Sequence, residues 1–374
     1  MKVPFLDLTA AYRSQKAEID QAVARVLERT DFILGESVAA FEREFAAYCE
    51  APLAVGLASG LDAIKLGLRA CGIGPGDEVI CPAHTFIATL FGISGVGAAP
   101  RLVEVDDDSC NINPDLIEAA ITPRTKAIIA VHLYGRPAEM DRIREIAQRR
   151  RLLLLEDAAQ AHGARHQGQR VGSFGRFAAF SLYPAKNLGA FGDGGVLVTG
   201  DAALAEKVSA LRNYGCTVKY HHTEMGENSR LDTLHAAILR VKLKRLDETN
   251  HLRRLAADRY REKLSGIEGL RLPAHPQGAD HVYHLFVVRT ARRDALVAHL
   301  QKNEIGCVVH YPVPCHLQPC YKDLGYVEGD FPVTERICRE VLSLPLYPEI
   351  SKQQIDAAVD VVRDFFKSPS IPAP

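Results

Sequence analysis

The chain has 374 residues, of which 47% are hydrophobic and 24% charged, and its formal net charge is -1 at pH 7. A charge this close to zero excludes a global electrostatic field that would attract nucleic acid or an anionic membrane, and no apolar run reaches the ~20 residues of a membrane-spanning helix. The length suits two domains, or one large domain with a smaller companion.

The cysteines and the N-terminus predict a cytoplasmic protein with reduced thiols. The chain has nine cysteines, an odd number, and no Cys-x-x-Cys pair. That pattern differs from the even count of a small secreted disulfide framework. Cys315 and Cys320 lie close together, but no His or Cys with metal-ligand spacing flanks them. The first residues, Met1–Asp7, contain no apolar stretch of the kind found in a signal peptide.

From residue 51 to residue 199, short apolar runs alternate with longer amphipathic stretches. The apolar runs predict strands at Leu53–Leu57, Glu78–Cys81, Arg101–Val105, Lys126–His132, Leu152–Glu156, Phe177–Ser181 and Gly195–Thr199. Helices are predicted between them at Gly60–Ala70, Ile87–Ser94, Pro114–Ala120 and Met140–Arg149. This alternation is typical of an α/β fold with a mainly parallel sheet covered by helices on both faces.

The remainder of the chain predicts further helices and then a smaller α/β unit. Helices are expected at Ala202–Leu211 and Leu231–Leu246, followed by a long polar helix from about Asn250. The smaller unit is predicted as strand Tyr283–Arg289, helix Arg293–Lys302, strand Cys307–His310 and helix Lys352–Phe366. We therefore predict a large domain over residues 1–249 and a small domain over 250–374, with a disordered Pro-rich tail at Ser368–Pro374.

Ligands of open parallel sheets bind just beyond the carboxyl ends of the strands. Polar residues follow the apolar runs in four segments: Ser59-Gly60, Pro82–Phe86, Asp157–Gln160 and Ser181–Lys186. These segments are predicted to converge on one edge of the sheet and to form the site.

Asp157 and Lys186 are the leading candidates within these segments. A carboxylate that ends a buried strand needs a cation or hydrogen-bond donors, and a protonated pyridinium nitrogen would keep Asp157 ionised. The alternative for Asp157 is a helix N-cap. Lys186 opens the glycine-rich stretch Lys186–Gly195, and a crowded pocket lowers the pKa of a lysine that forms a Schiff base. The alternative for Lys186 is an ordinary surface lysine.

Five further residues suit a phosphorylated aromatic ligand. Ser59, Gly60 and Leu61 open a predicted helix, whose backbone N–H groups form a ready phosphate site, although Ser59 could simply cap that helix. Ser181 could donate a second hydrogen bond to the phosphate. Phe86 could lie flat on the ligand ring, or it could belong to the core.

The chain resembles the DegT/DnrJ/EryC1/StrS family, the sugar aminotransferases of fold-type I, over nearly its whole length. The matching stretches are Gly35–Glu42, Ala58–Ala63, Glu156–Gly163, Phe180–Gly195, Asn228–Asp232 and His310–Pro312. The resemblance implies pyridoxal 5'-phosphate as cofactor, covalent attachment at Lys186 and a seven-stranded sheet with a smaller C-terminal α/β domain.

The resemblance also assigns the cofactor-binding residues. Asp157 would pair with the pyridine nitrogen, and Gln160 would lie near the 3-oxygen of the ring. Ser181 and the backbone of Gly60 and Leu61 would hold the phosphate, and Phe86 would stack on the ring. Asn228 would reach the cofactor phosphate of a neighbouring subunit, which implies a homodimer. The family usually has Thr where this chain has Leu61, so a hydroxyl contact is lost there while a backbone contact survives.

The substrate implied is a nucleotide-linked keto sugar, with L-glutamate as amino donor. Relatives that aminate carbon 4 of the sugar often carry His where this chain has Tyr183, so Tyr183 and the stretch Arg212–Gly215 resemble enzymes that aminate carbon 3 of dTDP-linked 6-deoxy-3-keto hexoses. Lys219, Tyr220 and Arg230 are expected to contact the nucleotide diphosphate. His310 and Tyr311 would line the sugar pocket. Plain packing for Tyr183 and a structural role for His310 remain open.

Four other functions were weighed against this one. A carbon-4 aminotransferase and a non-catalytic regulatory member of the same fold remain the alternatives. A cofactor-dependent sugar dehydratase is disfavoured because such relatives replace the lysine with His. A nicotinamide dehydrogenase is disfavoured because the glycine cluster after Lys186 does not spell Gly-x-Gly-x-x-Gly between a strand and a helix.

Overall fold

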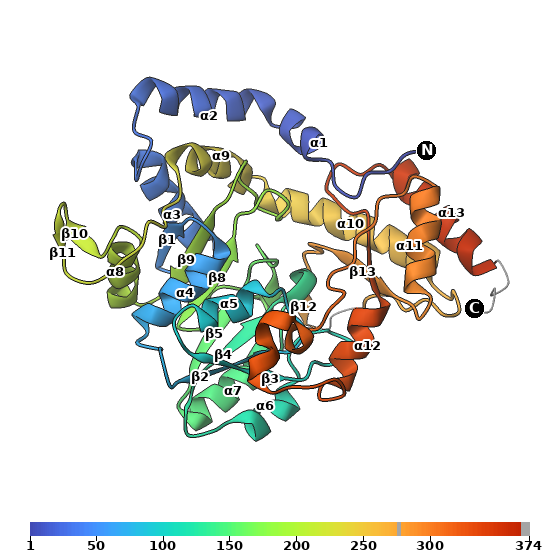
Figure 1. Cartoon of the computed structure of the whole chain (residues 1–374). Coiled ribbons are helices and arrows are strands. Elements are labelled where there is room, and N and C mark those ends of the chain that lie inside the picture. The colour runs from blue at the N-terminus through green and yellow to red at the C-terminus, as the bar shows by residue number, and fades with distance from the viewer. Residues whose placement is uncertain (275–277, 368–374) are drawn as a thin grey trace.

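The computed structural model describes residues 1–274 and 278–367, so the predicted disordered tail Ser368–Pro374 lies outside the described residues. Its centre is a seven-stranded sheet. In spatial order the strands are β1 (Leu53–Leu57), β9 (Gly195–Thr199), β8 (Phe177–Ser181), β5 (Leu153–Asp157), β4 (Thr125–Val131), β2 (Glu78–Pro82) and β3 (Ala99–Val103). Only β9 runs antiparallel to its neighbours, which confirms the predicted mainly parallel sheet (Figure 1).

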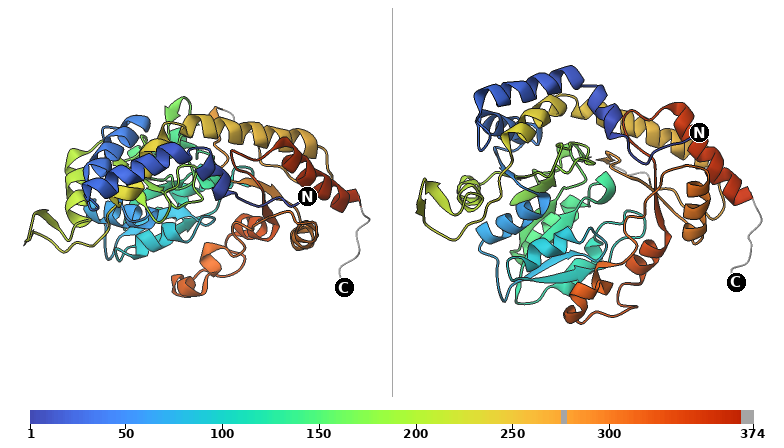
Figure 2. Two further views of the ribbon diagram at one scale, coloured as in Figure 1. Left: turned by 90° about the horizontal axis from the view of Figure 1, so that it is seen from above. Right: turned by 45° about the horizontal axis from the view of Figure 1, so that its top comes forward.

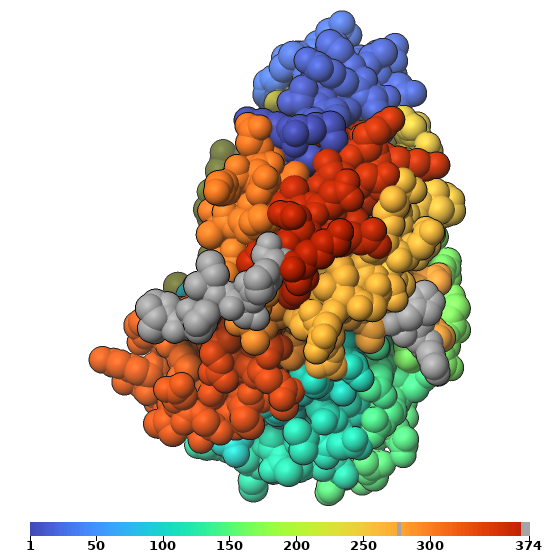
Figure 3. Space-filling view, turned by 90° about the vertical axis from the view of Figure 1, so that its right-hand side faces the viewer, coloured from blue at the N-terminus to red at the C-terminus, as the bar shows by residue number. Residues whose placement is uncertain are grey.

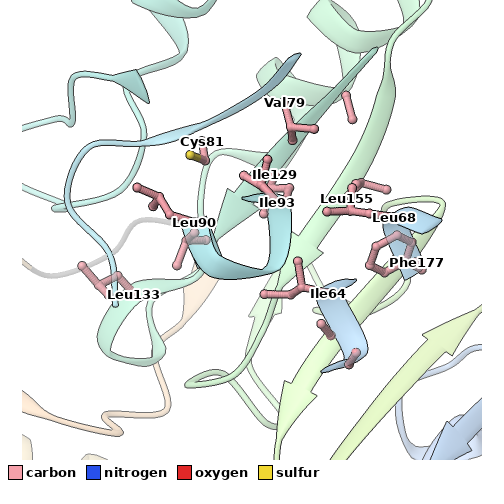
Figure 4. Close-up of a cluster of buried hydrophobic side chains, with 14 of the residues drawn as sticks. Ile64, Leu68, Val79, Cys81, Leu90, Ile93, Ile129, Leu133, Leu155 and Phe177 are labelled. Atoms are coloured by element: carbon pink, nitrogen blue, oxygen red, sulfur yellow. The ribbon is translucent and has the colours of Figure 1, made fainter. Parts of the chain in front are cut away.

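Helices cover both faces of the sheet, as the sequence predicted. One face carries α4 (Gly60–Ala70), α5 (Ala88–Ser94) and α8 (Ala202–Leu211), and the other carries α3 (Glu36–Tyr48), α6 (Pro114–Ala120), α7 (Met140–Arg150) and α9 (Thr233–Leu243). Alternate residues of a strand point to opposite faces, so Ile129 packs with α4 and α5 whereas Ile128 packs with α6 and α7. Figure 4 shows the first of these clusters, with Ile64 of α4 and Ile93 of α5 directed at Ile129 and Leu155.

The smaller C-terminal unit is built on its own core. The long helix α10 (Leu246–Leu264) leads into it, and strands β13 (Phe286–Arg289) and β14 (Val341–Leu344) pair antiparallel. Helices α11 (Arg293–Lys302), α12 (Pro332–Glu340) and α13 (Lys352–Lys367) complete it. Because α10 already begins at Leu246, the predicted helix Leu231–Leu246 is split into α9 and the start of α10. The domain boundary at residue 250 stays a prediction.

The strand predicted at Cys307–His310 is wrong. This segment makes a single isolated bridge, between Val308 and Ser343 of β14, and the true partner of β13 is β14, which the sequence analysis missed. Pro312 and Pro314 follow directly, and proline has no N–H with which to extend a ladder. The predicted strand Arg101–Val105 is also displaced: β3 begins two residues earlier, and Val105 instead bridges Ile112.

The N-terminal segment crosses the molecule. Helix α2 (Lys16–Arg29) packs along α9, and the chain before α1 (Leu8–Arg13) runs to the C-terminal unit, where Val3 bridges Ile305. Figures 2 and 3 show this segment, in blue, against the C-terminal helices. Short elements fill the connections: β6 (Arg165–His166), β7 (Gln169–Arg170), β10 (Cys216–Val218), β11 (His221–His222), β12 (Ala279–Asp280) and the 3-10 turns Leu133–Gly135, Cys315–Leu317 and Pro319–Leu324.

Two predictions about the whole chain can be compared with this structure. All nine cysteines are free thiols, as predicted. Within the described ranges, no helix has the length and apolar character that crossing a bilayer requires.

Candidate active site

A cavity of about 790 Å³ opens at the carboxyl edge of the sheet, where the sequence placed the site. Most of the predicted site residues line it: Ser59, Gly60, Leu61, Phe86, Asp157, Gln160, Ser181, Tyr183, Lys186, His310 and Tyr311. The volume lies in the usual range for a ligand pocket.

The strand register explains why these segments meet. Asp157 is the last residue of β5 and Ser181 the last residue of β8. Ser181 pairs with Gly195, the first residue of β9, and Gly195 also pairs with Leu57, the last residue of β1. Because β9 runs in the opposite direction, its start lies at the same edge as the ends of its two neighbours.

The N-terminus of α4 approaches this edge closely because two glycines allow it. A Cβ on Gly60 would lie 2.9 Å from the Cβ of Ser181, and a Cβ on Gly195 would lie 2.2 Å from the carbonyl carbon of Ser59. The Oγ of Ser59 accepts a hydrogen bond from the backbone N–H of Asp62 at 3.0 Å, so Ser59 caps α4, as the alternative interpretation proposed. The capped helix still presents its first turn to the cavity, which is a favourable place for a phosphate.

Asp157 is buried, with 6% of its surface exposed, and both of its oxygens are held. Oδ2 accepts a hydrogen bond from the Thr89 hydroxyl at 2.7 Å, and Oδ1 accepts from the backbone N–H of Ala159 at 3.1 Å. Thr89 is held in turn by Thr85, with 2.8 Å between the two hydroxyls. No helix begins after Asp157, so the helix N-cap weighed for it is wrong. Asp157 instead holds a turn through the Ala159 N–H and also lines the cavity.

Lys186 is not an ordinary surface lysine. Burial lowers the pKa of its amine to about 8, and the nearby charge of Asp157 acts in the opposite direction. A tight turn carries it: the backbone N–H of Lys186 donates to Tyr183 O at 2.9 Å, and a Cβ on Gly189 would lie 2.4 Å from Pro184 O. An amine with this pKa is substantially neutral near pH 8 and can act as a nucleophile.

Gln160 is fixed at both ends of its amide. Its Oε1 accepts from the backbone N–H of Tyr134 at 2.6 Å, and its Nε2 donates to the Tyr311 hydroxyl at 3.0 Å. The phenol of Tyr134 donates to the carbonyl of His310 and lies 2.7 Å from His84 Nε2. Tyr134 thus ties Gln160 to the 310–311 segment, although it was not predicted. Its position just after β4, at the same edge of the sheet, is the signal that would have found it.

The predicted aromatic residues of the cavity differ in their surroundings. Phe86 and Tyr183 are 51% and 54% exposed, so neither is a core residue and the packing alternatives for both are wrong. The ring of Phe86 lies 5.3 Å from that of Tyr311. His310 Nδ1 lies 2.8 Å from the Ser343 hydroxyl, and burial lowers the pKa of His310 to about 4. His310 therefore has a structural contact and also lines the cavity.

Four predicted residues do not line the cavity: Lys219, Tyr220, Asn228 and Arg230. All of them lie on the projection, which we define as residues 212–230 and which carries β10 and β11 (Figure 1). Tyr220 is 83% exposed and Asn228 is exposed. Arg230 donates to Asn213 Oδ1 at 2.9 Å and lies over the ring of Tyr214. The expectation that Asn228 serves a neighbouring subunit stays a prediction.

The geometry of the cavity fits the predicted cofactor. The closeness of Gly60 to Ser181 leaves no room for a Cβ, so backbone donors and a hydroxyl meet there without a side chain between them. Asp157 supplies a buried carboxylate, and Lys186 supplies an amine with a lowered pKa, in the wall of the same cavity. A phosphate group, a ring nitrogen and an aldehyde carbon each find a matching partner in this set.

The chain matches known proteins over nearly its whole length. It is 51% identical to dTDP-3-amino-3,4,6-trideoxy-alpha-D-glucose transaminase of Streptomyces venezuelae, over 97% of this chain and 96% of that protein. It is 47% identical to dTDP-3-amino-3,6-dideoxy-alpha-D-galactopyranose transaminase of Aneurinibacillus thermoaerophilus, over 97% and 99%. The crystal structure of S. venezuelae DesV in complex with a ketimine intermediate superposes with a TM-score of 0.97 at 51% identity, covering 99% of this chain and 100% of that one.

A family model agrees with these individual comparisons and with the motifs quoted from the sequence. It is the model of the DegT/DnrJ/EryC1/StrS aminotransferase family, and it matches residues 13–363. The chain belongs to the DegT/DnrJ/EryC1/StrS aminotransferase family.

Proposed function

We propose that this protein uses pyridoxal 5'-phosphate to transfer the amino group of L-glutamate to a nucleotide-linked keto sugar. The substrate we infer is a dTDP-linked 3-keto-6-deoxyhexose, which becomes the 3-amino sugar. The observation that carries the proposal is that the amine of Lys186, the carboxylate of Asp157 and the N-terminus of α4 all line one cavity.

Each residue has a defined task in this proposal. When bound, pyridoxal phosphate supplies an electron sink for the electron pair left behind as the substrate loses its α-proton. Asp157 keeps a proton on the ring nitrogen, which that sink requires. The first turn of α4 and Ser181 bind the phosphate. Lys186 attaches the cofactor and then, as a free amine with a pKa of about 8, accepts and returns the substrate proton.

Carbon 3 is favoured over carbon 4 as the site of amination. Both dTDP-sugar relatives carry names that place the amino group at carbon 3. Tyr183, in place of the His found in many carbon-4 enzymes, lies in the cavity wall with more than half of its surface exposed. It is therefore free to contact a sugar. The intact pair of Lys186 and Asp157 argues against a purely regulatory member of the fold.

A homodimer is part of the proposal. The projection carries Val218, Tyr220 and Met225 with 64%, 83% and 85% of their surfaces exposed. Exposed apolar residues that gather in one segment mark an interaction site. We infer that a second copy receives this segment, so that Asn228 reaches the cofactor phosphate of the neighbour and Lys219, Tyr220 and Arg230 contact its nucleotide.

A panel of nucleotide-linked 3-keto and 4-keto sugars tests the function. The protein is first converted to its amino form with L-glutamate, and the cofactor absorbance is followed as each sugar is added. A dTDP-linked 3-keto-6-deoxyhexose is expected to restore the original spectrum fastest. Faster restoration by 4-keto sugars would reverse the carbon assignment, and no response to glutamate would refute transamination. The Lys186→Ala variant is the control, and it should show neither the spectrum of attached cofactor nor turnover.

A further inference from the structure

Asn250 of α10 is a buried side chain that the proposed chemistry does not use, although it contacts two segments of the active site. Only 1% of its surface is exposed, and a buried amide costs free energy unless its polar atoms are hydrogen-bonded. Its amide contacts Asn187, the residue after Lys186. It also contacts the backbone of His162, two residues after Gln160. One side chain therefore joins the two segments that carry these site residues.

The orientation of the Asn250 amide follows from a backbone carbonyl, which can only accept hydrogen bonds. The carbonyl of His162 lies 2.8 Å from Asn250, so the group at that contact is the NH₂ of Asn250. The oxygen Oδ1 of Asn250 then accepts from the NH₂ of Asn187 at 2.8 Å. The NH₂ of Asn187 also donates to the carbonyl of Val282 at 3.0 Å, which agrees with this orientation. Asn250 thus donates to one segment and accepts from the other.

The segment joined through His162 is the one that follows β5. Asp157 ends that strand, and its Oδ1 accepts from the backbone N–H of Ala159. The N–H of Ala161 donates to the carbonyl of Ala158 at 2.9 Å, so the chain between Asp157 and His162 forms a compact turn. A shift of the His162 carbonyl would therefore move the backbone that holds Asp157.

The segment joined through Asn187 is the loop that carries Lys186. The amide of Asn187 has three partners, since its NH₂ donates to Asn250 and Val282 and its oxygen lies 3.2 Å from His284 Nδ1. Because Lys186 and Asn187 share a planar peptide bond, these contacts limit where the backbone of Lys186 can lie.

Gly163 leaves room for the Asn250 amide. A Cβ on Gly163 would lie 2.8 Å from Nδ2 of Asn250 and 2.3 Å from the hydroxyl of Tyr48. The φ of Gly163 is +86°, which also favours glycine. A larger residue at this position would push the amide away from the carbonyl of His162.

We propose that Asn250 is a positioning residue that fixes the spacing between the Lys186 loop and the segment after Asp157. Its importance for catalysis rests on the proposed function, because a cofactor that contacts both groups requires that spacing. The bridge itself rests on the two hydrogen bonds of one amide. A displacement of about 1 Å in such a site can lower a rate by about 10²-fold.

Two variants of the full chain change the bridge. Asn250→Leu has nearly the same shape and loses both hydrogen bonds. Asn250→Asp keeps both while its carboxyl is protonated, because the O–H can donate to His162 and the other oxygen can accept from Asn187. Burial raises the pKa of such a carboxyl, and its ionisation removes the donor and places a negative charge against a carbonyl.

Thr199→Val is the matched control. Thr199 is as buried as Asn250 and ends β9, at the opposite end of that strand from the cavity. Its hydroxyl donates to the carbonyl of Arg176 at 2.7 Å and accepts from the N–H of Asp201 at 3.0 Å. The variant therefore loses the same number and kind of hydrogen bonds, at a place that holds no site residue.

The first measurement is the hydrogen exchange of backbone amides, followed by mass spectrometry on the protein as purified. Exchange in residues 160–164 and 186–190 is compared with exchange in β4 of the same protein. In Asn250→Leu the two segments should exchange at least about tenfold faster than in Thr199→Val, because the hydrogen bonds that hold them are lost. The same exchange pattern in the two variants would overturn the proposal.

The second measurement is the half-reaction with L-glutamate, followed by cofactor absorbance. In Asn250→Leu the rate at saturating glutamate should fall about 10²-fold and the KM should change less, while Thr199→Val should stay near wild type. Asn250→Asp should be faster than Asn250→Leu below the pKa of its carboxyl, and the difference should disappear as that carboxyl ionises. Equal rates for Asn250→Asp and Asn250→Leu at every pH, or a loss confined to KM, would contradict the proposal.

The Asn250→Asp variant also serves if Asn250→Leu does not fold. Its rate relative to wild type should then fall as the pH rises, and a constant ratio from about pH 5 to pH 10 would count against the bridge.

The two measurements separate this inference from the proposed function. Faster exchange in residues 160–164 and 186–190 of Asn250→Leu, in a protein that transaminates nothing, would support the bridge and refute the function. Transamination by the wild type, with unchanged exchange and rate in Asn250→Leu, would support the function and refute the inference.

Discussion

The cavity edge and the projection differ in how their functional groups are held. At the cavity edge, Asp157 and Gln160 each use two hydrogen bonds to fixed partners, and both are nearly inaccessible to solvent. On the projection, Tyr220 and Met225 have more than four-fifths of their surfaces exposed. A preorganised edge suits chemistry that depends on exact placement, while the side chains of the projection are open to solvent in the single chain.

This difference shows that the proposed cofactor residues and the proposed nucleotide residues are brought to the site in different ways. The cofactor residues converge within one chain because strand register brings them together. The residues expected to contact the nucleotide, including Lys219 and Arg230, do not reach the cavity in the same chain. A second copy is the simplest source of the missing contacts, since homodimers with two-fold symmetry are the commonest assemblies.

The largest effect is expected from removing charge at the cavity edge. Asp157→Asn keeps an oxygen that can accept from the Ala159 N–H, but it cannot hold a proton on a ring nitrogen. We expect turnover to fall by roughly 10²- to 10⁴-fold, the range seen when a proton-holding group is lost, while the melting temperature changes little. Turnover within about tenfold of wild type would reduce Asp157 to a turn-capping residue.

A smaller effect is expected on the projection. Arg230→Ala removes the charge-assisted contact to the diphosphate that we propose, so the KM for the nucleotide sugar should rise about tenfold. The half-reaction with L-glutamate, followed by cofactor absorbance, should be unaffected. Arg339→Ala, an exposed arginine on α12, is the matched control and should leave both values unchanged. Equal losses of activity in the two half-reactions would indicate that Arg230 supports cofactor binding and not nucleotide binding.

The smallest expected change is a partial recovery of activity when two inactive variants are mixed. It tests whether Lys186 and Asn228 of one active site come from different chains. Lys186→Ala and Asn228→Ala proteins are mixed, unfolded and refolded together. If Asn228 acts on the neighbour, each mixed dimer contains one intact site, and random mixing should restore about a quarter of wild-type activity. Activity no higher than the mean of the two parents would mean that Asn228 acts within its own chain or not at all.

The local pattern of the sequence was sufficient to predict the bounds of the strands and the helix that border the site. Strand Leu53–Leu57, helix Gly60–Ala70 and strand Phe177–Ser181 have the predicted bounds. They could be predicted because short apolar runs and amphipathic periods reflect burial on one or two faces. The rule that ligands bind at the carboxyl edge of a parallel sheet then predicted one site for Asp157 and Lys186, and both line one cavity.

Some hydrogen bonds of the site and the pairing of β14 could not be predicted, because their partners are distant in the sequence. Thr89 lies 68 residues from Asp157, and Tyr134 is linked to His310 across 176 residues. Nothing in the immediate neighbourhood of Thr89 distinguishes it from a helix residue of the core. The missed strand β14 pairs with β13 across two intervening helices, α11 and α12, and its apolar run gave no sign of which segment would pair with it.

The sequence by itself determined the class of fold, the edge of the sheet where the cavity lies, and the lysine and carboxylate that line it. These follow from burial periodicity and from residue chemistry, both of which are local. Only the tertiary structure decided how Asp157 and Gln160 are held and which partner fixes each of their polar atoms. Those properties come from hydrogen bonds between residues far apart in the chain, and such contacts exist only once the chain has folded.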